Sequence, residues 1–115
     1  MNNDLLIVDL KQAIASTGSE SLAREIIGMF LAKFPTDREA IEIAYTNQDW
    51  PLLTQLVHKF HGGCAYAGVP KLKATTQSLE QALKAEPMGD IDALFQAFLD
   101  VMIETEDAAQ SYIQG

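Results

Sequence analysis

The chain has 115 residues, a formal net charge of −8 at pH 7, and a hydrophobic content of 48%. A chain of this length can form one domain whose core needs no metal or disulfide support. The acidic balance argues against nucleic acid as a partner, and no apolar run is long enough for membrane insertion. Cys64 is the single cysteine and cannot form an intrachain disulfide, which favours a reducing cytoplasm.

Apolar residues recur at helical spacing along most of the chain, and no segment shows the alternation typical of a strand. The first eight residues are expected to form a loose or extended lead-in. Asp9 is a predicted N-cap for a short helix that ends near Ser16. In that helix, Leu10 and Ile14 are predicted to face the core.

A long second helix is predicted from about Glu20 to Thr46. Thr17 precedes Glu20 by three residues, which is the spacing of a capping box. Pro35 lacks a backbone donor and clashes with the preceding turn, so we expect a kink or break near Lys33–Phe34. The apolar face of this helix consists of Leu22, Ile26, Ile27, Phe30, Leu31, Phe34, Ile41, Ala44 and Tyr45.

Three further helices are predicted to begin at Asp49, at Pro70 and at Asp90. Gly68 is a suitable C-terminal stop for the first of these three. The next has one apolar stripe, and the last has an apolar face broad enough to pack against two neighbours. Four long amphipathic helices with short connections predict an all-α fold, an antiparallel four-helix bundle with a short additional N-terminal helix across one end.

The third helix, residues 49–67, is predicted to bury one stripe and to expose a histidine. His58 lies roughly 140° from the apolar stripe, and Gly62 and Ala65 lie beside it on the open face. Glycine in a helix interior costs about 1 kcal/mol relative to alanine, so the pair Gly62-Gly63 favours a surface kept bare for docking. The buried stripe is predicted to contain Leu53, Leu56, Val57, Phe60, Cys64 and Ala67.

The charge is unevenly distributed. Between Val57 and Lys84 the chain has four lysines and one acid, a local balance of +3, whereas the remainder carries −11. Two interpretations remain open: an ordinary solvated face, or a surface that steers an acidic partner onto the histidine helix. The lysines concerned are Lys59, Lys71, Lys73 and Lys84.

Three interpretations of His58 also remain open. It is a surface residue without a role, a zinc ligand together with His61 and Cys64, or a nucleophile that accepts a phosphoryl group. The candidate zinc ligands spread over roughly 120° of the helix, and Cys64 faces the predicted core. A nucleophilic histidine needs a nearby cation or donor for the phosphoryl oxygens, and His61 is placed to provide one.

A longer pattern surrounds this histidine: His58-x-x-His61-Gly62-x-x-x-x-x-Gly68, followed by Leu72 and by Leu79-Glu80. The pattern begins upstream, with Val8-Asp9 and then Phe30, Pro35 and Asp49. Over roughly residues 8–85 the chain resembles the histidine phosphotransfer (HPt) domains of multistep phosphorelays. The segment from His61 to Lys71 is especially similar to HPt domains that end hybrid sensor kinases of the BarA/GacS type.

The resemblance implies that His58 is the phosphorylated residue and that Gly62 leaves room for an incoming receiver domain. Most family members have lysine where this chain has His61, so His61 is expected to orient the phosphoryl group or supply charge to it. The predicted partner-binding surface is completed by Lys59, Ala65, Lys71 and Lys73.

By this resemblance the whole chain, residues 1–115, is one HPt domain that accepts a phosphoryl group from a receiver aspartate and passes it to a response regulator. The expected partners are receiver domains and a hybrid sensor kinase. The domain is expected to be a monomer without its own cofactor, since the partner receiver supplies Mg²⁺. The sequence has no P-loop or kinase motif, so neither ATP binding nor autophosphorylation is expected.

Two alternatives remain open, a non-catalytic helical adaptor and a His/Cys metal-binding helical domain. The expected location is the cytoplasm, either as a separate protein or as a domain of a membrane-bound hybrid kinase. The direction of phosphoryl flow is not determined by the sequence.

Overall fold

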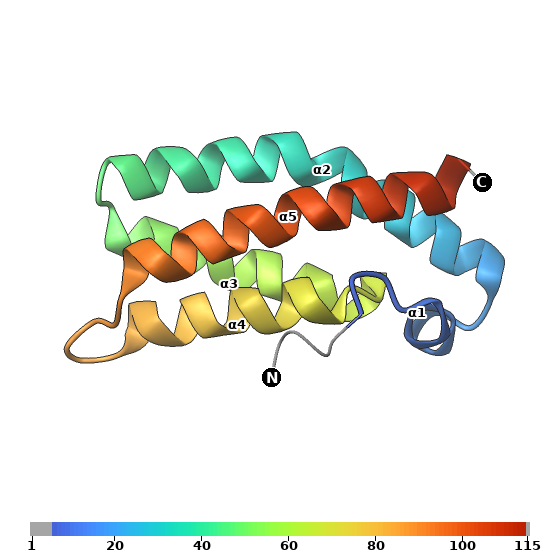
Figure 1. Ribbon diagram of the computed structural model, residues 1–115, viewed down its shortest axis with the longest axis horizontal. Helices are drawn as coiled ribbons and strands as arrows, with labels where there is room; N and C mark the ends of the chain where they lie inside the picture. Colours follow the sequence, from blue (N-terminus) through green and yellow to red (C-terminus); the bar gives the residue numbers. More distant parts are fainter. Residues whose placement is uncertain (1–5, 115) are drawn as a thin grey trace.

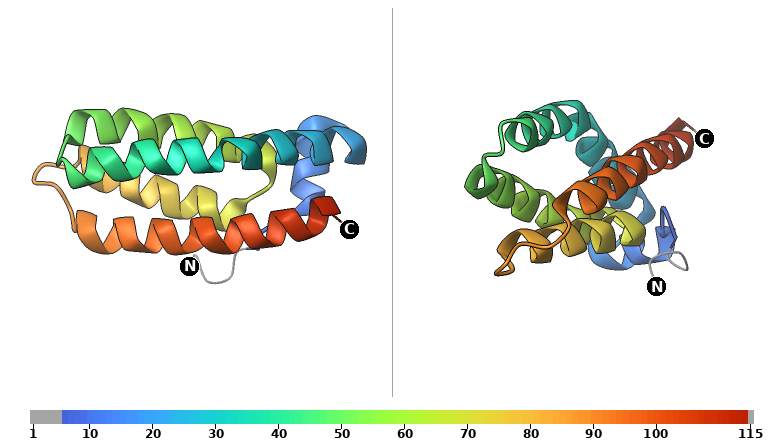
Figure 2. Two further views of the ribbon diagram at one scale, coloured as in Figure 1. Left: turned by 90° about the horizontal axis from the view of Figure 1, so that it is seen from above. Right: turned by 60° about the vertical axis from the view of Figure 1, so that its left-hand side comes forward.

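The computed structural model describes residues 6–114. This part of the chain contains no strand and consists of five helices: α1 (Leu10–Thr17), α2 (Glu20–Thr46), α3 (Trp50–Ala67), α4 (Pro70–Lys84) and α5 (Ile91–Gln114). The four long helices lie side by side, and α1 crosses one end of the bundle (Figures 1 and 2). The predicted all-α antiparallel bundle with an extra N-terminal helix is therefore confirmed. Within residues 6–114, no helix is long and apolar enough to span a membrane.

Side chains cap the start of most helices. Asp9 accepts a hydrogen bond from the Gln12 amide at 3.1 Å, as predicted, and Asp49 and Asp90 cap α3 and α5 in the same way. The predicted cap of α2 is wrong. Ser19, rather than Thr17, accepts from the Leu22 amide at 3.1 Å, whereas the Thr17 hydroxyl donates back to the Ala13 carbonyl at 2.9 Å and belongs to the end of α1.

Pro35 lies inside α2, which continues as a single helix from Glu20 to Thr46. The alternative of a break near this residue is therefore excluded. Figure 1 shows that α2 nevertheless changes direction along its length. A bend is expected where proline removes one backbone hydrogen bond and crowds the preceding turn.

The main core lies between the four long helices. Four phenylalanine rings pack in its centre, with the Phe34 and Phe60 centroids 5.7 Å apart and the Phe60 and Phe98 centroids 5.5 Å apart. The predicted stripe of α3 is buried, except that Leu56 is half-buried. This burial turns the opposite face of α3 outward, and that face contains His58.

A second, smaller cluster joins α1 to the extended ends of α2 and α5. Its buried members are Ala13, Ala23, Ile27 and Ala109. Here two predicted core residues are wrong, since Leu10 is 37% exposed and Leu22 is 47% exposed. The helices turn other side chains into this contact, Ala13 from α1 and Ala23 and Ile27 from α2.

The corner between α3 and α4 requires glycine. Gly68 has a φ of 66°, and a Cβ atom at this position would lie 2.6 Å from the Asp9 carbonyl oxygen and 2.7 Å from the Ala13 Cβ. The Asp9 amide donates to the Gly68 carbonyl at 2.7 Å. Gly68 therefore ends α3 in a left-handed conformation and lets the start of α1 sit directly against the corner.

Candidate functional site

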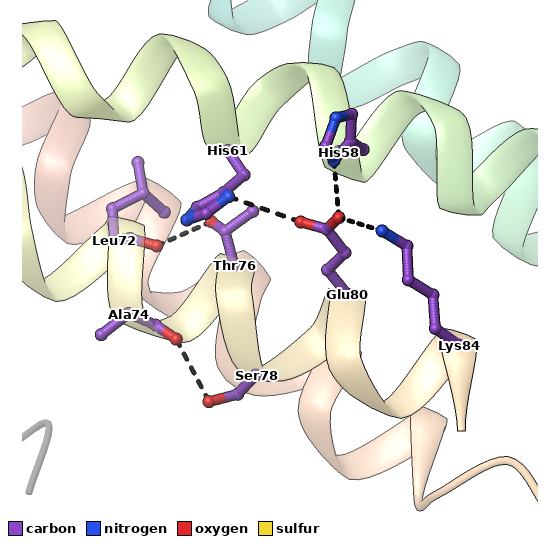
Figure 3. Close-up of polar contacts among 8 residues, drawn as sticks. All are labelled: His58, His61, Leu72, Ala74, Thr76, Ser78, Glu80 and Lys84. Carbon is purple, nitrogen blue, oxygen red and sulfur yellow. Dashed lines mark hydrogen bonds and ion pairs between the residues drawn. The ribbon is translucent and has the colours of Figure 1, made fainter. Parts of the chain in front are cut away.

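His58 lies on the exposed face of α3, and its side chain points toward α4 (Figure 3). The side chain is 68% exposed, as predicted from its position opposite the buried stripe. It is therefore accessible to a second protein.

Glu80 of α4 connects the polar side chains of the site (Figure 3). Its Oε2 atom lies 2.6 Å from His58 Nδ1 and 2.6 Å from Lys84 Nζ. Its other oxygen, Oε1, lies 3.4 Å from His61 Nδ1. The Glu80 side chain is only 9% exposed, so these three groups replace most of the water that a carboxylate would otherwise bind.

Glu80 is ionised at neutral pH. Burial alone would raise the pKa of this carboxyl group, but the hydrogen bonds and charges of Lys84 and His58 outweigh burial and hold the pKa below its ordinary value. An ionised carboxylate has no proton to donate, so in its contact with His58 it can only accept.

The Glu80 contact determines the tautomer of His58. Because Oε2 accepts, Nδ1 carries the proton, and in the neutral imidazole Nε2 then keeps its lone pair. The site therefore presents an unprotonated nitrogen on an exposed side chain, which is what a nucleophilic histidine requires.

His61 lies one turn along α3 from His58 and packs against the same carboxylate. Its side chain is 23% exposed. Its Nε2 atom is buried and has no hydrogen-bond partner among the residues that the structure describes. The structure thus brings His61 to Glu80; its predicted role toward a phosphoryl group stays a prediction.

The two consecutive glycines of α3 have different surroundings. A Cβ atom at Gly62 would have no described atom within 4 Å outside the local helix, whereas one at Gly63 would lie 3.4 Å from the Phe30 ring. Gly62 and Ala65 are both exposed next to His58. The open surface predicted beside His58 is therefore present at Gly62, whereas Gly63, although exposed, lies next to Phe30.

The four lysines of the basic stretch do not form one free patch. Lys84 is bonded to Glu80, and Lys71 Nζ lies 3.3 Å from Glu104 Oε2 of α5. Lys59 is exposed and Lys73 is half-buried. Two of the four charges are thus directed at carboxylates of the same chain.

The predicted zinc alternative is not supported by the geometry. Cys64 is 1% exposed, and burial raises the pKa of its thiol to about 12. Within residues 6–114, no three His, Cys, Asp or Glu side chains are grouped so as to hold a metal ion. His58 and His61 both lie against Glu80, whereas the Cys64 side chain is buried in the core.

Glu80 and Lys84 are the site residues that the sequence did not assign. A signal was present, because His58 stands ten residues before Gly68 and Glu80 stands twelve after it. In two antiparallel helices joined at a corner, residues at similar distances from that corner face each other. Glu80 is also the only acid between Val57 and Lys84.

The fold is a helical bundle with one exposed imidazole whose Nδ1 is held by a carboxylate. These features are those of a protein that exchanges a phosphoryl group with another protein. The chain belongs to the Hpt domain family, whose family model matches residues 25–109. It is an HPt domain of the kind that serves phosphorelays in two-component signalling.

Similar proteins support this assignment. The chain is 35% identical to the sensor protein GacS of Pseudomonas syringae pv. syringae, over 76% of this chain and 10% of that protein. It is 37% identical to the signal transduction histidine-protein kinase BarA of Escherichia coli (strain K12), over 66% of this chain and 8% of that kinase. The chain thus spans about a tenth of the length of these relatives.

A solved structure has the same fold. It is the HPT domain from a sensor hybrid histidine kinase of Shewanella, with a TM-score of 0.85, 26% sequence identity and 94% coverage of both chains. The resemblance to HPt domains and to BarA/GacS-type kinases is therefore confirmed.

Proposed function

We propose that His58 accepts a phosphoryl group from an aspartyl phosphate of a receiver domain and passes it to an aspartate of a response regulator. The observation that carries this proposal is the 2.6 Å contact between His58 Nδ1 and Glu80 Oε2. It leaves Nε2 unprotonated on a side chain that is 68% exposed.

In the first step, the Nε2 lone pair of His58 attacks the phosphorus atom of the aspartyl phosphate. A bond forms between Nε2 and phosphorus, the bond between phosphorus and the aspartate oxygen breaks, and the aspartate leaves as a carboxylate with the bonding electrons. No proton moves, because Nε2 carries none and Nδ1 keeps its own. In the second step the Nε2–phosphorus bond breaks in favour of an oxygen of the next aspartate, and the lone pair returns to Nε2.

Glu80 supports this exchange electrostatically. With a proton on Nδ1 and phosphorus on Nε2, the phosphorylated ring is positively charged, and the adjacent carboxylate stabilises it. Lys84 balances the charge of Glu80 at 2.6 Å, and His61 is proposed to help orient the phosphoryl oxygens. Phosphoryl transfer depends largely on positioning and charge stabilisation, and we propose that the Mg²⁺ it uses is held by the receiver.

The proposed partners are the receiver domains of a hybrid kinase and of a response regulator, and the domain is proposed to act as a monomer. We propose that the whole chain, residues 1–115, acts as one domain. The helical segments outside the matched residues 25–109 support this, because α1 packs against α2 and α3.

The test is transfer of labelled phosphate from phosphorylated receiver domains of the source organism. Wild type should gain a label that acid removes and base does not, and His58→Gln should gain none while its circular dichroism is unchanged. His61→Gln separates the roles of the two histidines: it should still gain the label, but more slowly than wild type, because His61 is proposed to help orient the phosphoryl oxygens. A labelled His58→Gln protein contradicts the assignment, and binding of a receiver without any label indicates an adaptor instead.

A further inference from the structure

Tyr66 is the most exposed of the large hydrophobic side chains in the part of the chain that the structure describes. It is 62% exposed and lies in the last turn of α3. It follows His58 by eight residues, which places it about 12 Å farther along the helix and roughly 80° around it. Covering this ring with a partner would remove apolar surface from water and so favour association.

The other aromatic residues all have a partner within the domain. Tyr45, for example, stacks on Phe95 with centroids 3.9 Å apart, and Arg24 lies over the Tyr112 ring at 4.9 Å. Within residues 6–114, Tyr66 is the one aromatic side chain with neither an aromatic nor a cation–π contact. Packing within the described domain therefore does not account for its position.

Only small residues lie on the surface between Tyr66 and His58. Gly62 and Ala65 lie between the two residues on the exposed face of α3, and a Cβ atom at Gly62 would meet no described atom within 4 Å outside the local helix. A partner that reaches His58 Nε2 over this surface can therefore contact the Tyr66 ring without first displacing a large side chain.

The size of a protein interface places Tyr66 under the partner. A specific interface buries about 800 Å² on each side, equivalent to a disc of about 16 Å radius. An interface of this size centred on His58 would reach Tyr66, which is about 12 Å farther along the helix. Tyrosine is also enriched among the few residues that contribute most of the energy of an interface.

We infer that Tyr66 is the apolar docking anchor for the receiver domain that exchanges phosphate with His58. This inference rests on the proposed function and adds to it a residue that contributes to affinity without touching the reacting atoms. Tyr66 should consequently govern how tightly the receiver binds and leave the rate of transfer within the complex unchanged.

The test uses a receiver domain of the source organism that labels the wild-type protein. Transfer rates are measured at increasing receiver concentration for Tyr66→Ala, for Tyr66→Phe and for Ile103→Ala. Ile103 is a matched control, since it is 53% exposed and belongs to α5, across the bundle from α3 (Figure 2). Tyr66→Ala should raise the half-saturating receiver concentration about tenfold, with an unchanged rate at saturation. Tyr66→Phe and Ile103→Ala should stay close to wild type.

An NMR titration of the wild-type protein with the unphosphorylated receiver tests the same inference without any variant. The Tyr66 ring resonances should shift, and the Ile103 methyl resonances should not. Equal behaviour of Tyr66→Ala and Ile103→Ala, or an unshifted Tyr66 ring at saturation, overturns the inference while the proposed function stands. If no receiver labels the wild-type chain, the proposed function itself fails.

Discussion

The carboxylate of Glu80 lies 2.6 Å from Nδ1 of His58, and this contact selects the imidazole nitrogen that is free to react. The two residues belong to different helices, and the carboxylate is largely buried while the imidazole is exposed. Glu80 thus holds the His58 imidazole from the core side, and a partner protein can reach it from the solvent side. Such an arrangement fixes the tautomer without blocking access to Nε2.

The first prediction concerns this tautomer. In the wild-type protein, ¹⁵N NMR of the neutral His58 imidazole should show the proton on Nδ1. Glu80→Ala should lose this preference and slow phosphoryl acceptance by about 10- to 100-fold, by analogy with the loss seen when the hydrogen-bond partner of a metal-bound histidine is removed. Glu106→Ala is the control, because Glu106 of α5 pairs with Arg38 of α2, away from His58. An unchanged tautomer in Glu80→Ala would refute the role assigned to Glu80.

The second prediction concerns acid stability. Because the pKa of Glu80 is lower in the folded protein than its ordinary value of 4.5, folding favours the ionised form. The stabilisation is therefore present above the unfolded pKa and is lost as pH falls through the folded pKa. The groups facing this carboxylate are Lys84, His58 and His61.

Urea unfolding of wild type and Glu80→Gln between pH 3 and 6 measures this effect. The difference in the free energy of unfolding should be largest near pH 6 and should shrink below about pH 4.5. Comparing the two proteins cancels the titration of the other carboxylates. If the difference stays constant across this range, ionisation of Glu80 does not contribute to the free energy of unfolding.

The third prediction separates the two glycines of α3. Gly62→Ala should raise the free energy of unfolding by up to about 1 kcal/mol, because alanine favours the helix and the added methyl group enters open space. Gly63→Ala should gain less than Gly62→Ala, since its methyl group would lie at the short end of van der Waals contact, 3.4 Å from the Phe30 ring; an equal or larger gain would contradict this. Chemical unfolding of both variants provides the comparison.

Gly62→Leu extends this prediction to function. The leucine should be tolerated by the fold but should slow phosphoryl transfer sharply, because it occupies the surface over which the receiver approaches His58. Transfer kinetics and thermal unfolding are measured on the same sample. Reduced stability together with normal transfer would instead assign Gly62 to internal packing.

The fourth prediction concerns the basic stretch. Lys71 and Lys84 are paired with carboxylates of the chain, so Lys59 should contribute more than either to attraction of an acidic receiver. Lys59→Glu should lower the association rate several-fold at low salt, and the effect should fade near 1 M salt, where charges are screened beyond about 3 Å. Lys11→Glu makes the same charge change on α1. Association rates are measured by stopped-flow mixing. If both variants lower the rate equally, Lys59 acts only through the net charge of the domain and not through its position.

Much of the fold follows from periodicity. Burial of Leu53, Val57 and Phe60 requires only that one side of a helix be apolar, and the helical period specifies that side. The outward position of His58 follows from the same pattern. These features are local to one helix, so sequence spacing was sufficient to predict them.

The features that were missed depend on how helices meet. Ala13 and Ala23 are buried at the α1 contact in place of Leu10 and Leu22, because the way α1 crosses the bundle decides which side of each helix is covered. The contact of Glu80 with His58 likewise depends on the relative rotation of α3 and α4 about their corner. Sequence spacing makes this pairing possible, but it does not show that both carboxylate oxygens are occupied.

The corner at Gly68 has a consequence for moving this site into another protein. The motif residues His58, Gly62 and Glu80 all lie within the matched segment 25–109. The partner of the Gly68 carbonyl, the Asp9 amide, lies outside it, as do Ala13 and Ala23. Transferring only the matched segment to another protein would therefore keep the site residues but lose the contact between Asp9 and Gly68 that supports the corner between α3 and α4. We therefore expect the smallest transferable unit to be longer than the matched segment and to include Asp9, just before α1.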